Sequence, residues 1–101
     1  MIRLIKEEKI LVEFEEVINK MIAETTPFPA RFKQMIQESS ILEACQALLE
    51  SNKISDGFTS MILKNRMDLT VEYVVANNEE FQKLFTEKQI NHAKERIQNN
   101  N

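Results

Sequence analysis

The sequence predicts an all-α protein, a compact bundle of one longer N-terminal helix and five or six short helices. Three observations lead to this prediction. Apolar residues recur with the 3.6-residue period of a helix along most of the 101 residues, and helix-capping patterns precede several of these segments. The chain also has only one glycine and two prolines. So few turn-forming residues argue against β-sandwiches, β-barrels and Rossmann-type domains, which need glycine at many tight turns.

Length and composition indicate a single folded domain. The chain weighs 11.8 kDa, with 43% hydrophobic and 29% charged residues, which is enough for one core and too little for two. We expect residues 1–98 to form one helical domain and the polar residues 99–101 to fray. No apolar run reaches the roughly 18–20 residues of a membrane span, and four charged residues follow the first five. We therefore expect a cytoplasmic protein.

The first helix is predicted at about residues 7–24. Its apolar stripe consists of Ile10, Phe14, Val17, Ile18, Met21 and Ile22. Residues 2–5 and 10–14 could instead pair as a β-hairpin, but no glycine or Asn-Gly turn separates them, which favours the helix. Pro27 and Pro29 end this helix and form the one hinge that we predict, because proline lacks a backbone donor and disfavours helix before it.

Capping patterns place the later helices. Three pairs have capping-box spacing, in which two side chains satisfy free backbone amides of the first turn: Ser40 with Glu43, Asn77 with Glu80, and Thr86 with Gln89. Ser55 or Asp56 begins another helix, and Asp68 or Thr70 a further one. Three valines in residues 71–75 leave a strand as the alternative there, although the flanking caps favour helix.

The residue types predict no catalytic, cofactor or metal site. A single glycine cannot build a phosphate-binding loop. Cys45 is the only cysteine, which excludes a disulfide framework, and we expect it to be buried on a helix face. His92 is the only histidine, and we expect it to be exposed and without a partner. Adjacent glutamates point about 100° apart on a helix and do not converge. We therefore expect a protein that is not an enzyme.

With no catalytic site predicted, the functions left to consider are binding to DNA, to another protein or to a second copy of the chain. The net charge is −3, whereas DNA-binding domains usually carry a basic excess. One alternative is a helix-turn-helix regulator built from residues 41–51 and 56–65, with Thr59, Ser60 and Lys64 facing DNA. Another is a self-assembling structural protein whose first helix pairs with its copy, so a homo-oligomer stays open.

Flexible apolar side chains are plentiful, and they suit a protein-binding surface. We expect Met21, Met35 and Met61 to belong to the core and Met67 to be exposed. Residues 80–85 partly resemble peptides that dock in sliding clamps, but their helical spacing favours a place in the core.

The middle of the chain carries a further pattern. It consists of Phe32-Lys33-Gln34-Met35-Ile36-Gln37-Glu38, then Ser40-Ile41-Leu42-Glu43-Ala44, then Leu48-Leu49-Glu50-Ser51-Asn52-Lys53-Ile54, followed by Phe58 and Ile62. Over residues 31–66 this pattern resembles the tailed-phage late-transcription coactivators. The resemblance implies an all-α adaptor that joins the flap of host RNA polymerase to the DNA-loaded sliding clamp without contacting specific bases.

The resemblance also implies which positions form the binding surface. Carried over residue by residue, they are Ile41, Leu42, Ala44, Leu48, Leu49, Ile54 and Phe58. Ile41 stands where the family usually has an aromatic residue, and residues 96–101 lack the family's hydrophobic, acidic clamp-binding tail. We expect Met67 to belong to the same binding surface, and the protein to be a small helical adaptor that contacts another protein. The resemblance implies RNA polymerase as that partner, and a nucleic acid is less favoured. If a phage encodes the protein, we expect it in the host cytoplasm.

Overall fold

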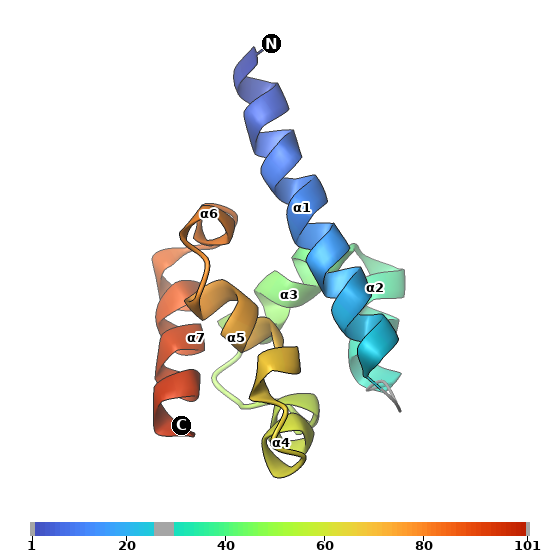
Figure 1. Ribbon diagram of the computed structural model, residues 1–101, viewed down its shortest axis with the longest axis vertical. Coiled ribbons are helices and arrows are strands. Elements are labelled where there is room, and N and C mark those ends of the chain that lie inside the picture. The colour runs from blue at the N-terminus through green and yellow to red at the C-terminus, as the bar shows by residue number, and fades with distance from the viewer. Residues whose placement is uncertain (1, 26–29, 101) are drawn as a thin grey trace.

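The computed structural model describes residues 2–25 and 30–100, and it is built from helices (Figure 1). In chain order these are α1 (Ile2–Glu24), α2 (Ala30–Glu38), α3 (Ile41–Glu50), α4 (Asp56–Leu63), the 3₁₀ turn η1 (Met67–Leu69), α5 (Val71–Ala76), α6 (Glu79–Gln82) and α7 (Glu87–Asn99). No strand occurs in the described residues, so the all-α prediction is confirmed. The first helix replaces the alternative hairpin and starts five residues earlier than predicted. The proline hinge lies outside the described residues.

The helices pack around α3 and α5. The chain-terminal helix α7 lies against both of them, α2 packs on α3, and α1 crosses α3 and α6 (Figure 1). The first turns of α1 extend away from the other helices, which contributes to dimensions of 44 × 26 × 20 Å. Among the described helices, none combines the length and hydropathy that a membrane span needs.

Phe14 of α1 is at the centre of the core. Its ring makes edge-to-face contacts with Phe81 and Phe85, at centroid distances of 5.3 and 5.5 Å. Phe81, Leu84 and Phe85 therefore pack in or against the core, as their helical spacing predicted. Val17 was predicted to be buried, but its side chain is 37% exposed. The buried residues of α1 are spaced four or three residues apart, at Ile10, Phe14, Ile18 and Met21, and Val17 does not belong to this series.

The methionines follow the predicted pattern in part. Met21 and Met61 are buried, and Met35 is half-buried against the core. Met67 is half-buried as well, contrary to the expectation of an exposed side chain, because η1 packs against α4 and α5.

The capping predictions are confirmed in part. Thr86 and Gln89 form the complete capping box, with each side chain accepting the other residue's backbone amide. Ser40 accepts a hydrogen bond from the backbone amide of Glu43, but the reciprocal bond, from the Ser40 amide to the Glu43 carboxylate, is not found among the described contacts. Two hydrogen bonds at α7 and one at α3 thus satisfy amides that helix starts leave free.

Three other helix starts resolve choices that the sequence left open. Ser55 caps α4 and Thr70 caps α5, each accepting an amide at 3.1 Å. Asn77 was predicted to cap the next helix, but Asn78 does so, while Asn77 ends α5. The helix α7 continues through Asn99, and the fraying of residues 99–101 stays a prediction.

Replacing Phe14 with alanine is expected to lower the free energy of unfolding by about 3–5 kcal/mol, since the cavity left behind cannot close fully. Urea denaturation measures the loss. The matched control is Val12→Ala on the exposed side of α1, for which we expect a change within about 0.5 kcal/mol. Equal losses in both variants would contradict the central place of Phe14 in the core.

Candidate functional site

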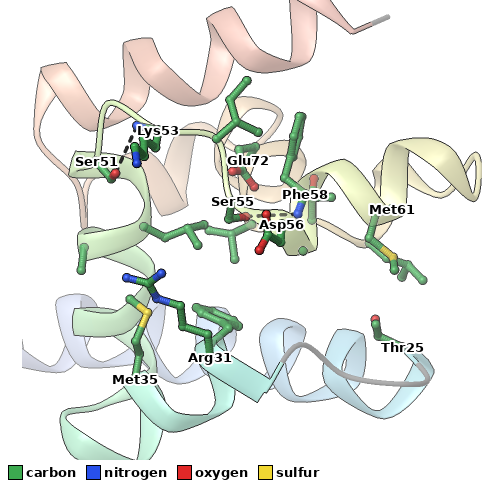
Figure 2. Close-up of a pocket in the computed structure, with 18 of the residues that line it drawn as sticks. Thr25, Arg31, Met35, Ser51, Lys53, Ser55, Asp56, Phe58, Met61 and Glu72 are labelled. Carbon is green, nitrogen blue, oxygen red and sulfur yellow. Dashed lines mark hydrogen bonds between the residues drawn. The ribbon is translucent and has the colours of Figure 1, made fainter.

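An open cavity of about 610 Å³ lies between the end of α1, α2, the end of α3, α4 and the η1–α5 segment (Figure 2). Its size falls in the range of ligand-binding pockets. Much of its wall is apolar, from Phe32, Met35, Leu48, Ile54, Phe58 and Met61. The connection at residues 51–55 forms one edge, because α3 ends at Glu50 and α4 starts only after its cap at Ser55.

Three of the predicted partner-binding residues lie in this cavity. They are Leu48 from α3, Ile54 from the connection and Phe58 from α4. Ile54 is 47% exposed, whereas Leu48 is half-buried and Phe58 is buried in the wall. The structure thus brings these three predicted positions together on one concave surface.

The other predicted positions lie elsewhere. Ile41 and Leu42 are half-buried against the core, and Met67 lies outside the cavity. Ala44 and Leu49 are buried in the core and do not line the cavity, so they do not lie on the predicted binding surface. Helical spacing alone does not tell which of two apolar faces of α3 meets the core.

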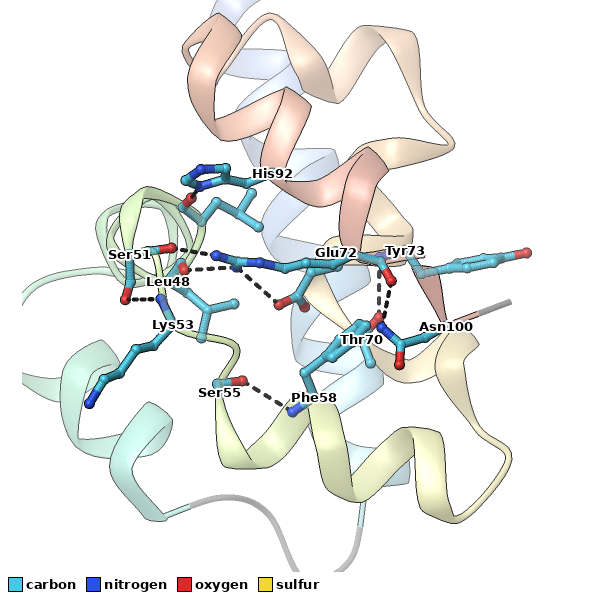
Figure 3. A network of polar contacts seen from close by, with 12 residues as sticks. Leu48, Ser51, Lys53, Ser55, Phe58, Thr70, Glu72, Tyr73, His92 and Asn100 are labelled. Atoms are coloured by element: carbon cyan, nitrogen blue, oxygen red, sulfur yellow. Dashed lines mark hydrogen bonds and ion pairs between the residues drawn. The ribbon is translucent and has the colours of Figure 1, made fainter. Parts of the chain in front are cut away.

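A buried charged pair stands behind the cavity (Figure 3). Glu72 of α5 is 1% exposed and Arg96 of α7 is 6% exposed, with Arg96 Nη1 3.6 Å from Glu72 Oε2. The guanidinium also donates hydrogen bonds to the backbone carbonyls of Leu48, at 3.3 Å, and Ser51. Arg96 therefore joins the end of α3 to α5.

Further polar contacts connect α7 to α3. His92 Nδ1 lies 2.6 Å from the carbonyl oxygen of Leu49, so the expectation of an exposed, unpartnered histidine is wrong. Gln89 donates to Glu50 at 3.2 Å, and Lys88 Nζ lies 2.8 Å from the same carboxylate. The hydrogen bonds from Lys88 and then Gln89 lower the pKa of Glu50.

Burial sets the electrostatics around Glu72. Desolvation raises the pKa of Glu72 to about 7, although its own backbone amide and the charge of Arg96 act in the opposite direction. Burial, and next the nearby charge of Glu72, raise the pKa of the Cys45 thiol. The buried Cys45 agrees with the prediction, and its thiol stays protonated and is a poor nucleophile.

The sequence carried only a weak signal for this pair. Glu72 lies three residues before Val75, and both are buried on one side of α5. On α7 the buried residues Gln89, Ala93 and Arg96 follow the helical spacing of one face. The same spacing also fits a charged side chain that faces water, so it did not identify the ion pair.

The described residues contain no group of three or more histidine, cysteine, aspartate or glutamate side chains placed to hold a metal ion. No family model matches the chain, and no curated protein or solved structure is significantly similar to it. The resemblance of residues 31–66 to the phage coactivators therefore stays a prediction.

Replacing Arg96 with methionine is expected to destabilise the fold by about 3–5 kcal/mol, because Glu72 loses its charged partner in the interior. The exposed residue of the same helix, Lys94→Met, serves as the control and should change stability by less than about 0.5 kcal/mol. Adding Glu72→Gln to the Arg96 variant should recover part of the loss, which a double-mutant cycle measures. Strictly additive losses would show that the two side chains do not interact.

Stability should also depend on pH through Glu72. Its pKa is about 7 in the fold, against an ordinary value of 4.5, so the folded state holds the proton more tightly. Protonated Glu72 therefore stabilises the fold fully below pH 4.5. This contribution to the free energy of unfolding, about 3 kcal/mol in all, is lost as the pH rises through 7. The Cys45 thiol stays neutral in this range, because its pKa is raised.

Urea denaturation between pH 5 and 8 tests this dependence. The wild-type free energy of unfolding should fall with pH more steeply than that of Glu72→Gln, whose Arg96 keeps both carbonyl acceptors. Every other titration is common to the two proteins, so their difference isolates Glu72. Parallel curves would mean that the carboxyl group does not titrate in this range.

Proposed function

We propose that this protein is a non-enzymatic helical adaptor that binds a partner protein by receiving an apolar segment of that partner in the cavity. The observation that carries the proposal is the open apolar wall formed by Leu48, Ile54 and Phe58 at the meeting of α2, α3 and α4. Covering apolar surface that faces water is favourable, and concave apolar surfaces commonly mark binding sites.

The charged groups at the cavity suit binding. Arg31, Lys53 and Asp56 are exposed, and Glu72 is buried in the wall. Exposed charges at the border of an apolar patch are typical of protein interfaces, where they guide orientation and contribute little affinity. The Cys45 thiol does not line this cavity.

We propose RNA polymerase as the first partner to test, because the resemblance of residues 31–66 implies it. Of the seven positions that the resemblance carries over, Leu48, Ile54 and Phe58 line the cavity. The proposed binding site therefore includes the part of the resemblance that faces the solvent-accessible side of the fold.

A helix-turn-helix regulator has less support. The connection at residues 51–55 is longer than the three- to four-residue turn typical of that motif, and α4 packs mainly against η1. Arg66, which follows the end of α4, pairs with Asp68 at 3.1 Å. Self-association through α1 has the support of two exposed valines, Val12 and Val17.

Site-specific photo-crosslinking tests the proposed surface. A photoreactive phenylalanine analogue replaces Ile54 at the cavity or Leu63, which is 82% exposed on α4 and outside the cavity. In extract from the source cell or its phage-infected host, we expect one protein to crosslink at position 54 and not at 63. A polymerase subunit in that band would support the coactivator proposal, and identical bands at both positions would contradict the adaptor site.

A matched pair of substitutions gives the independent check. Ile54→Asp should abolish the crosslinked band from a probe at Lys53, because burying an unpaired carboxylate in an apolar contact is costly. Leu63→Asp should leave that band unchanged. Circular dichroism should show both variants folded, because both side chains are largely exposed. A steeply salt-sensitive shift of DNA by the wild type would instead favour the DNA-binding alternative.

A further inference from the structure

The cavity wall contains one buried ionisable side chain. Glu72 lines the cavity and is 1% exposed, whereas the other charged lining residues, Arg31, Lys53 and Asp56, are exposed. In Figure 2 the Glu72 carboxyl group points from α5 toward the part of the cavity that holds Ser55 and Asp56. A buried acidic group therefore lies in the wall of the cavity, among apolar side chains and exposed polar ones.

The hydrogen bonding of this carboxyl group is incomplete. Its Oε2 atom accepts no hydrogen bond from any described residue. Arg96 Nη1 is 3.6 Å away, beyond the 2.7–2.9 Å typical of a charge-assisted hydrogen bond. Figure 3 shows the cause, because the guanidinium donates to the carbonyl oxygens of Leu48 and Ser51. Glu72 is thus a buried acceptor that can still take a donor.

We propose that the segment received by the cavity carries a lysine or arginine among its apolar residues, and that its cationic group pairs with Glu72. This inference rests on the proposed function, since it names the chemistry of the occupant of the same cavity. An occupant covers the wall and removes water from it, which strengthens attraction between opposite charges. A purely apolar occupant would leave the carboxylate buried without a donor, which is costly.

The rest of the cavity is consistent with such an occupant. Apolar side chains from α2, α3 and α4 contact the apolar part of the segment. Arg31, Lys53 and Asp56 are all exposed, so solvent and salt screen their charges. Protonation of Glu72 competes with cation binding, because the neutral acid has no charge to pair.

Three probes with the same six-carbon chain separate charge from apolar contact: n-hexylammonium, 1-hexanol and n-hexanoate. Amide chemical shifts in ¹H–¹⁵N NMR spectra of the full chain, followed at Leu48, Ile54 and Phe58, report binding at pH 8. We expect hexylammonium to bind about tenfold more tightly than hexanol, as a charge-assisted hydrogen bond implies, and hexanoate more weakly than either. At pH 5, where Glu72 is protonated, hexylammonium and hexanol should bind equally.

Glu72→Gln should reduce hexylammonium affinity to that of hexanol, while Asp56→Asn, the exposed control, should keep most of the preference. The pH comparison in the wild type tests the same point without a substitution. Equal binding of all three probes would overturn the inference and leave the apolar adaptor site standing. A preference lost in Asp56→Asn and kept in Glu72→Gln would also overturn it. Failure of hexanol and hexylammonium alike would contradict both the inference and the adaptor site.

Discussion

The position of α7 depends on the guanidinium of Arg96. This one side chain reaches the carboxyl group of Glu72 in α5 and the backbone carbonyls at the end of α3. Carbonyls at a helix end have no partner within their own helix, so a cation there satisfies them and the negative end of the helix dipole. The contact of His92 with the Leu49 carbonyl adds to the same connection.

This arrangement shapes the cavity. Because Arg96 holds the end of α3 against α5, the connection at residues 51–55 must leave α3 at that point and return to α4 across the open side. Glu72 is placed with its carboxyl group between the interior and the cavity wall. The contacts of Arg96 and Glu72 therefore stabilise the fold and also place a charged acceptor at the proposed binding surface.

Local patterns predicted most of the secondary structure, and the resemblance of residues 31–66 implied part of the candidate site. Helical periodicity and the caps at Ser40, Ser55, Thr70 and Thr86 predicted helices that the structure contains. They misplaced one cap, because Asn77 and Asn78 are equally suitable residue types. Leu48, Ile54 and Phe58 were among the predicted binding residues, but Ala44 and Leu49 were not distinguishable from them, since apolar residues serve cores and interfaces alike.

The all-α class, the absence of glycine-dependent folds and the buried Cys45 follow from composition and from spacing within single segments, because helix formation depends on neighbours one turn away. Composition and local spacing do not predict the burial of Glu72 and Arg96, the partner of His92 or the existence of the cavity. Each joins distant parts of the chain, as Leu48 and Arg96 do across 48 residues. Such contacts depend on which helix faces meet, and a charged residue on an isolated helix gives the same pattern whether it meets water or an opposite charge.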